Sequence, residues 1–272
     1  MATLSLGVIM GFTTDPEPYA RVREVGATTC QLNTSRPFEI TEELAHAARA
    51  TAEAAGVTIT SLWCGWSGPS KWNFTEGPST IGLVPAAYRE TRTKELVRGA
   101  QVTAWLGLSN MATHVGFLPV DPKDPDYLGT VASLQQIADA CGEVGVHFLF
   151  ETGQETPVVL RRCMHDIGRP NLGVNLDPAN LLMYGNANPV EALDLLGPYI
   201  RDVHAKDGEY PTNGQELGHE RVLGEGMVNF PVLIPKLKSF GYAGSLTIER
   251  EVSGPEQAEG IKRAIELLRP LL

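Results

Sequence analysis

The sequence predicts an α/β fold, a single (β/α)8 TIM barrel domain that spans residues 1–272. Short apolar segments alternate with longer amphipathic segments along the whole chain, a pattern typical of a parallel sheet with crossover helices. Eight such pairs can be counted, and the 272 residues are close to the ~250 that one α/β barrel uses. No segment has the composition of a linker between domains.

The predicted strands are short apolar runs that lie between turn signals and amphipathic stretches. The fourth strand is the least defined, because residues 105–109 are also apolar and compete with residues 111–115 for its position. The eight predicted ranges are 4–9, 28–32, 57–63, 111–115, 146–150, 172–176, 200–203 and 245–248.

The predicted helices lie between these strands, and several begin with proline, which the first turn of a helix tolerates. Glycine stands just before four of the strands, where a left-handed residue ends a helix and lets the chain turn. These glycines are Gly26, Gly56, Gly145 and Gly241. The helices are expected to begin near Pro16, Thr41, Ala86, Leu128, Pro157, Pro189, Pro231 and Pro255.

The composition argues against several classes of partner. Lys and Arg total 22 against 32 Asp and Glu, a net charge of −10, and no basic run is long enough to form a nucleic-acid surface. No apolar run approaches the ~18 residues of a membrane span, and the N-terminus does not resemble a secretory signal. We therefore expect a cytoplasmic protein with its four cysteines reduced, which binds neither nucleic acid nor membranes. A homo-oligomer is compatible with the sequence.

Two connections are too long for plain turns, residues 64–85 after the third strand and residues 206–230 after the seventh. Both follow the carboxyl end of a strand, the end at which barrel enzymes build their active sites. We therefore expect both to cover a substrate, with a neutral surface excursion as the alternative. The first connection is rich in aromatic residues, with Trp63, Trp66, Trp72 and Phe74 in or beside it.

Strands five to eight end in the same way, with an apolar residue followed by a polar one. Because side chains alternate between the two faces of a strand, an apolar residue that faces the helices directs the next side chain into the barrel. The residues that we expect to converge at the barrel mouth are Glu151, Asp177, His204 and Glu249.

Three carboxylates in a partly dry site repel one another, and a divalent cation removes this repulsion. Three carboxylate oxygens and one imidazole suit Mn²⁺ best, and Mg²⁺, Co²⁺ and Zn²⁺ are compatible with the same ligands. The sequence therefore predicts one divalent metal ion, with a purely structural hydrogen-bond network as the alternative.

Further candidates for substrate contact lie near the same mouth. His114 ends the fourth strand and is expected to bind a hydroxyl group of a substrate or relay a proton, unless it is a buried structural histidine. Lys206 lies two positions after a predicted ligand, so it either points inward as well, where it could stabilise an oxyanion, or is a surface lysine at the start of a loop. Trp66 either stacks on a ring of a substrate or packs within its own loop. Arg221, in the loop after strand seven, is either a substrate contact or a surface residue.

Several motifs carry a resemblance to a known family. They are FETGQET at residues 150–156, GVNLDPAN at 173–180, VHAKDG at 203–208, LGEG at 223–226, GY at 241–242 and TIE at 247–249. With these motifs the chain resembles the sugar phosphate isomerase and epimerase superfamily, the xylose isomerase-like TIM barrels. That superfamily includes ketose 3-epimerases, inosose-processing enzymes and endonuclease IV.

The resemblance implies that the four residues at the strand ends are metal ligands, in agreement with the argument from alternation. It further implies that Glu151 and Glu249 serve as acid and base in the epimerase branch. A metal-stabilised enediolate of a ketose or keto-sugar would then exchange a proton on either face. The chain departs from ketose 3-epimerases at two positions, where it has Asn180 for a histidine and Pro157 for a glutamate. Asn180 and the nearby Glu155 are expected to contact the substrate.

Three functions remain open at this point. An isomerase or epimerase acting on a sugar or polyol is the leading hypothesis. A metal-dependent lyase or dehydratase acting on an inosose or a 3-keto-glycoside would use the same ligands, but its product would differ in mass from the substrate. A non-catalytic sugar-binding barrel would leave the carbon-bound hydrogens in place. The sequence does not specify which sugar is used or whether it carries a phosphate.

Overall fold

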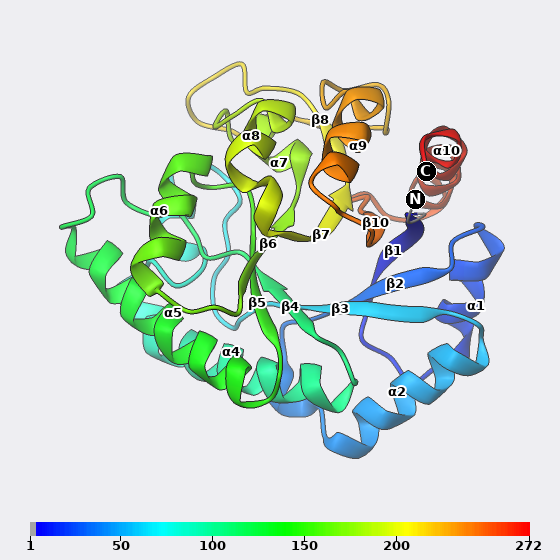
Figure 1. Cartoon of the computed structure of the whole chain (residues 1–272), viewed down its shortest axis with the longest axis horizontal. Coiled ribbons are helices and arrows are strands. Elements are labelled where there is room, and N and C mark those ends of the chain that lie inside the picture. The colour runs from blue at the N-terminus through cyan, green and yellow to red at the C-terminus, as the bar shows by residue number, and fades with distance from the viewer. Residues whose placement is uncertain (1–3) are drawn as a thin grey trace.

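Eight parallel strands close into a barrel in the computed structural model, which describes residues 4–272. The first strand closes the barrel against the last through a register that pairs Ser5 with Ser245 and Val8 with Ile248. Figure 1 shows the strands at the centre with helices around them, so the predicted (β/α)8 barrel is confirmed. The barrel strands are β1 (Ser5–Gly11), β2 (Thr29–Thr34), β3 (Thr58–Cys64), β4 (Asn110–Thr113), β5 (His147–Glu151), β6 (Leu172–Leu176), β7 (Ile200–Ala205) and β10 (Ser245–Ile248).

The eight predicted helices are present, and polar residues cap most of them. Thr156, for example, accepts a hydrogen bond from the Val159 backbone N–H at the start of its helix. The fourth predicted helix begins earlier than Leu128, because Asp124 caps the chain and Pro125 fits the first turn. These helices are α1 (Pro16–Glu24), α2 (Glu42–Ala54), α4 (Ala86–Trp105), α5 (Pro125–Glu143), α6 (Pro157–Ile167), α8 (Pro189–Leu196), α9 (Phe230–Ser239) and α10 (Pro255–Leu268).

The ambiguity at the fourth strand is resolved by the helix before it. Trp105 is the last residue of α4, so residues 105–109 form the turn into the strand, and β4 takes the position that residues 111–115 were predicted to fill. The four glycines predicted to end helices, Gly26, Gly56, Gly145 and Gly241, all have positive φ angles.

The sequence did not predict several short elements, because each is too brief to show a hydrophobic period. Two of these, α3 (Gly77–Thr80) and the antiparallel pair of β8 (Asp207–Gly208) and β9 (Glu220–Arg221), lie in the two long connections. A third, α7 (Pro178–Met183), follows β6 directly. Short 3₁₀ turns occur at η1 (Pro37–Glu39), η2 (Gly197–Tyr199) and η3 (Arg269–Leu271).

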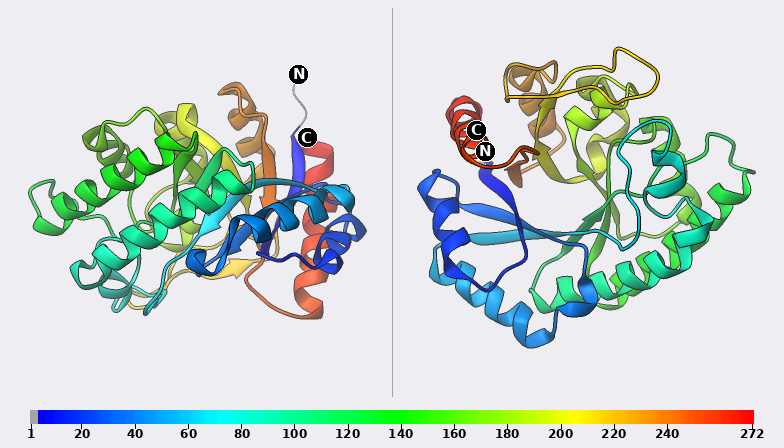
Figure 2. Two further views of the ribbon diagram at one scale, coloured as in Figure 1. Left: turned by 90° about the horizontal axis from the view of Figure 1, so that it is seen from below. Right: turned by 180° about the vertical axis from the view of Figure 1, so that it is seen from behind.

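The two long connections lie over the same end of the barrel and contact each other. The backbone N–H of Phe74 in the first donates to the carbonyl of Gln215 in the second at 3.2 Å. Figure 2 shows both loops on one side of the strands. A search of the helices among the described residues finds none that is long and apolar enough to cross a membrane.

Candidate metal centre and substrate pocket

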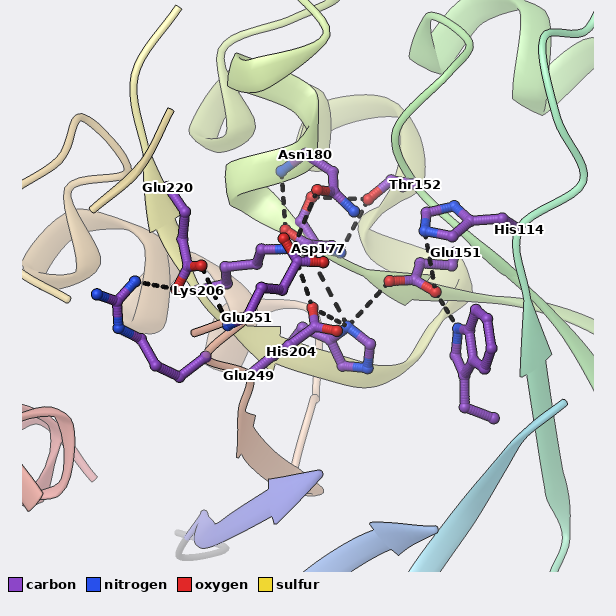
Figure 3. Close-up of polar contacts among 12 residues, drawn as sticks. His114, Glu151, Thr152, Asp177, Asn180, His204, Lys206, Glu220, Glu249 and Glu251 are labelled. Atoms are coloured by element: carbon purple, nitrogen blue, oxygen red, sulfur yellow. Dashed lines mark hydrogen bonds and ion pairs between the residues drawn. The ribbon is translucent and has the colours of Figure 1, made fainter. Parts of the chain in front are cut away.

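Four side chains from neighbouring strands meet at the carboxyl-end mouth of the barrel. Glu151 ends β5, Asp177 follows β6, His204 lies in β7 and Glu249 follows β10. In each case an apolar residue of the core precedes the polar one, as the alternation of strand side chains requires. Each residue offers one ligand atom, and these atoms all lie within 4.8 Å of one another. Figure 3 shows the four side chains pointing toward a common centre.

The imidazole of His204 lies at the middle of this cluster. Its Nδ1 is 3.0 Å from Glu151 Oε1, 3.3 Å from Glu249 Oε2 and 3.7 Å from Asp177 Oδ2. His204 and Asp177 are fully buried, and Glu151 is nearly so. Such a concentration of acidic groups away from water is costly unless positive charge balances it.

Two atoms in the cluster indicate that a cation fits there. His204 Nδ1 and Asp177 Oδ2 are buried and make no hydrogen bond with any described residue. Buried polar atoms in native proteins normally have a partner. Three carboxylates and one imidazole are donors that divalent cations accept, so this cluster could hold a metal ion.

Charged groups and burial shift the pKa values of the residues in the cluster. Burial lowers the pKa of His204, but the carboxylates of Glu151 and Glu249 outweigh it and raise that pKa well above its usual range. Burial likewise raises the pKa of Glu249, but Lys206 and His204 hold it well below its usual range. For Asp177 burial dominates and raises the pKa. The pKa of His204 is thus raised by the same acidic side chains that could bind a cation.

A second layer of buried polar residues fixes the ring of His204. Its Nε2 lies 2.8 Å from the side-chain oxygen of Gln31 on β2. The amide nitrogen of Gln31 donates to Ser61 Oγ at 2.9 Å and to Asp202 Oδ2 at 3.1 Å, and Ser61 also donates to Asp202. Because Gln31 presents an oxygen to Nε2, that nitrogen carries the proton and Nδ1 is left free to bind a metal.

Replacing Gln31 by leucine is expected to lower the affinity for Mn²⁺ by about 10–100-fold, the usual effect of losing such a supporting contact. Titration calorimetry of the purified variant measures this change. Gln101→Leu, on α4, is the control for a similar substitution away from the site. Equal Mn²⁺ affinity in Gln31→Leu and the wild type would show that Gln31 does not set the state of His204.

Glu151 is held from both sides. Its Oε1 faces His204, while its Oε2 accepts a hydrogen bond from the indole Nε1–H of Trp63 and lies 3.4 Å from His114 Nε2. Burial raises the pKa of Glu151, but His114 and His204 lower it below its usual value. The carboxylate is thereby oriented with one oxygen toward the cluster.

Lys206 lies buried beside the opposite carboxylate. Its Nζ is 3.1 Å from Glu251 Oε1, 3.2 Å from Glu249 Oε2 and 3.7 Å from Asp177 Oδ2, and it donates to Asn180 Oδ1 at 3.4 Å. Burial alone lowers the pKa of Lys206, but these carboxylates raise it well above its usual range. Of the two directions left open for this side chain, the structure has the inward one.

A pocket of about 320 Å³ is lined by two members of the cluster, Glu151 and Glu249. This volume is at the lower end of the ~300–1,000 Å³ typical of small-molecule sites, so it suits one small molecule. Trp72 and Leu217 bring the two long connections into its wall. The full lining comprises Ile9, Asn33, Trp63, Trp72, His114, Glu151, Asn180, Met183, Tyr184, Leu217, Glu249 and Glu251.

The candidates for substrate contact divide into two groups. His114 and Asn180 line the pocket, whereas Trp66, Lys206, Arg221 and Glu155 are absent from its lining. The guanidinium carbon of Arg92 lies 5.3 Å from the centre of the Trp66 ring. Trp66 therefore packs within the buried centre of its own loop. Arg221 pairs with Glu209 at 2.7 Å, on the outside of the β8–β9 pair. Burial raises the pKa of Glu155 to about 8.

Arg92, on α4, is a residue whose importance the sequence did not reveal. It is fully buried, and its guanidinium donates to the carbonyls of Ser67, Pro69, Thr80 and Gly82 at 2.7–3.2 Å. These four carbonyls belong to the long connection that carries Trp72 to the pocket. One side chain thus fixes much of this loop through charge-assisted hydrogen bonds. A charged residue with no predicted partner in an amphipathic helix gives no signal of such a role.

Asp207 fixes the other long connection in the same manner. Its carboxylate accepts hydrogen bonds from the backbone N–H groups of Gly208, Gly224, Gly226 and Val228 at 2.9–3.1 Å. A Cβ on Gly226 would lie 2.2 Å from Asp207 Oδ1, so only glycine fits there. The LGEG motif therefore supplies backbone N–H groups that bind the buried carboxylate of Asp207.

Comparisons with known proteins agree with this architecture. Residues 19–271 match the sequence model of the xylose isomerase-like TIM barrel family. An uncharacterized protein of Methanocaldococcus jannaschii is 38% identical over 186 residues, a match that spans 62% of this chain and 61% of that relative.

Two solved structures illustrate the likeness in three dimensions. A xylose isomerase domain protein from Planctomyces limnophilus is 33% identical, with a TM-score of 0.92, over 99% of this chain and 97% of its own. A D-psicose 3-epimerase, solved in the presence of D-fructose, has a TM-score of 0.71 at 18% identity and covers 99% of both chains. At that identity the second likeness shows the fold alone.

Proposed function

Because the chain belongs to the xylose isomerase-like TIM barrel family, we propose that it is a divalent-metal-dependent epimerase or isomerase of a ketose or keto-sugar. The observation that supports this most is the cluster of Glu151, Asp177, His204 and Glu249 at the floor of a pocket sized for one sugar. A carboxylate cluster open to such a pocket can both bind a cation and exchange protons with a bound molecule.

Glu151 and Glu249 are proposed to hold and move the protons. They lie on the outer two of four neighbouring strands, β5, β6, β7 and β10, and both line the pocket. A substrate between them would present one face to each carboxylate, so that one removes a proton and the other returns it. The chemistry that a divalent cation supplies at such a site is stabilisation of negative charge on a carbonyl oxygen.

The neighbours of the two carboxylates suit this division of labour. Lys206 Nζ donates a hydrogen bond to Glu249 at 3.2 Å, and the indole N–H of Trp63 donates one to Glu151. Both contacts favour the charged carboxylate, the form that accepts a proton. Trp63 and Trp72 in the pocket wall offer flat faces on which the apolar side of a sugar ring can stack.

The proposal is tested by incubating the Mn²⁺-loaded protein with common ketoses and keto-sugars in deuterium oxide. We expect one carbon-bound hydrogen to exchange, with a product of the same formula as the substrate. Mass spectrometry with nuclear magnetic resonance reports both results. A product that has lost water or an aglycone would identify a lyase or dehydratase. Binding of a sugar without exchange would identify a non-catalytic binding barrel.

A further inference from the structure

We infer that the pocket selects uncharged substrates, without phosphate or carboxylate groups, and that Glu251 at its rim enforces this selection. The inference rests on the proposed function, because it names the class of sugar that the same site accepts. It is carried by the arrangement of charged side chains around the pocket.

Negative charge exceeds positive charge around the pocket even when an ion is counted. Three carboxylates line the pocket, from Glu151, Glu249 and Glu251, and a fourth, from Asp177, belongs to the cluster that Glu151 and Glu249 share. A divalent cation together with the ammonium of Lys206 leaves one negative charge uncompensated. The whole chain also carries a net charge of −10, which repels anions at longer range.

Lys206, which lies beside Glu249 of the pocket lining, is not free to bind an anion. Lys206 Nζ contacts Glu249, Glu251 and Asp177 within 3.7 Å and is nearly fully buried. A phosphate that approached this ammonium would meet the carboxylates that already surround it. The like-charge repulsion and the loss of existing pairs both oppose such binding.

Two arginines in the segments that follow β8 and β10 are also paired. Arg250 Nη1 lies 2.5 Å from Glu220 Oε1 and Nη2 lies 3.2 Å from Glu256 Oε1, while Arg221 is paired with Glu209. No arginine or lysine is among the residues that line the pocket. Sites that recognise phosphate normally present arginine forks, lysine or free backbone N–H groups to it.

Glu251 is the residue placed to act on an incoming ligand. It lines the pocket, and its side chain is 55% exposed, in contrast to the buried carboxylates below it. Its backbone N–H donates to Glu220 Oε2 at 3.1 Å, which fixes this segment against β9. Figure 3 shows Glu251 beside Lys206 and Glu249. The carboxylate therefore stands where a charged substituent of a sugar would pass or rest.

The test compares binding of D-fructose, D-psicose, D-fructose 6-phosphate and D-gluconate to the Mn²⁺-loaded protein by titration calorimetry. Three variants are measured beside the wild type: Glu251→Gln, Glu251→Lys and, as a control, Glu259→Lys. Glu259 is exposed on α10 and does not line the pocket, so the control has the same change in net charge. Because the side chain of Glu251 is half exposed, glutamine is expected to leave the fold intact.

We expect the wild type to bind a neutral sugar at least about tenfold more tightly than the phosphate or the acid, from repulsion at the rim. Glu251→Gln should reduce this preference, Glu251→Lys should reduce it further, and Glu259→Lys should leave it unchanged. The inference is overturned if charged sugars bind best, if no neutral sugar binds, or if the Glu251 variants keep the wild-type preference. Selective binding of neutral sugars without deuterium exchange would support this inference while refuting the proposed catalysis.

Discussion

The Glu249→Gln variant is expected to lose epimerisation by about 10²–10⁴-fold, the usual contribution of one positioned acid or base. Glutamine keeps the size and one oxygen of the side chain but cannot accept a proton at neutral pH. The same loss is expected for Glu151→Gln. Conversion between two epimers, followed by nuclear magnetic resonance, measures both variants.

Deuterium exchange can distinguish the roles of the two carboxylates, because each is proposed to act on a different face of the substrate. If they flank the substrate, each variant should still exchange the hydrogen of one epimer, and the retained epimer should differ between the two variants. Glu259→Gln, at an exposed position on α10, is the control. Metal content is measured in parallel, because both residues are also candidate ligands. A metal-loaded Glu249→Gln protein that epimerises at the wild-type rate would exclude this residue as the base.

Removal of divalent cations by a chelator is expected to abolish exchange, and added Mn²⁺ should restore it. Ligand binding to the folded state alone also raises stability, by ~2.7 kcal/mol when the free ion is at 100 times its dissociation constant. A rise in melting temperature on adding Mn²⁺ should therefore accompany the return of activity. The Asp177→Asn and His204→Ala variants should show neither effect, because each removes a ligand atom.

The affinity for the metal should depend on pH in a defined direction. The pKa of His204 is raised well above its usual range by Glu151 and Glu249, against the lowering by burial, so the metal-free protein holds a proton there. A metal must displace that proton, so affinity should fall as the pH falls, by about tenfold per unit while one proton is released. Calorimetry in buffers of different ionisation enthalpy counts the released protons. Activity that survives chelation at any pH would contradict a metal-dependent reaction.

Much of the fold could be predicted because the spacing of hydrophobic residues indicates where the strands and helices lie. Alternation along the strands was sufficient to place Glu151, Asp177, His204 and Glu249 at one mouth, and the structure brings their ligand atoms within 4.8 Å. This inference needed only that an apolar residue face the helices, because the next side chain then points into the barrel.

The sequence could not predict contacts between distant segments. Gln31, Ser61 and Asp202 come from three different strands, so their network around His204 depends on how the barrel closes. They left a weak signal, since each is a polar residue inside an apolar strand. Arg92 and Asp207 bind backbone carbonyls and N–H groups of loops, and such contacts depend on loop shape, which no period in the sequence encodes.

The connection after β3 shows why composition alone could not tell which of its aromatic residues lines the pocket. Trp66 and Trp72 lie in the same loop, yet Trp72 lines the pocket whereas Trp66 packs against buried Arg92. The contact between Trp66 and Arg92 joins a loop to a helix, and loop composition does not encode it. Strand alternation left Lys206 either inward or at the surface, and its partner Glu251 was not foreseen, because it lies beyond the end of the last strand.

Anomalous X-ray diffraction from a crystal soaked in Mn²⁺ tests the metal centre most directly. We expect a single strong peak per chain, bounded by oxygens from three acidic side chains and by Nδ1 of the buried imidazole. A map with no peak at that position, or a peak bound by other residues, would contradict the metal centre and the chemistry proposed from it.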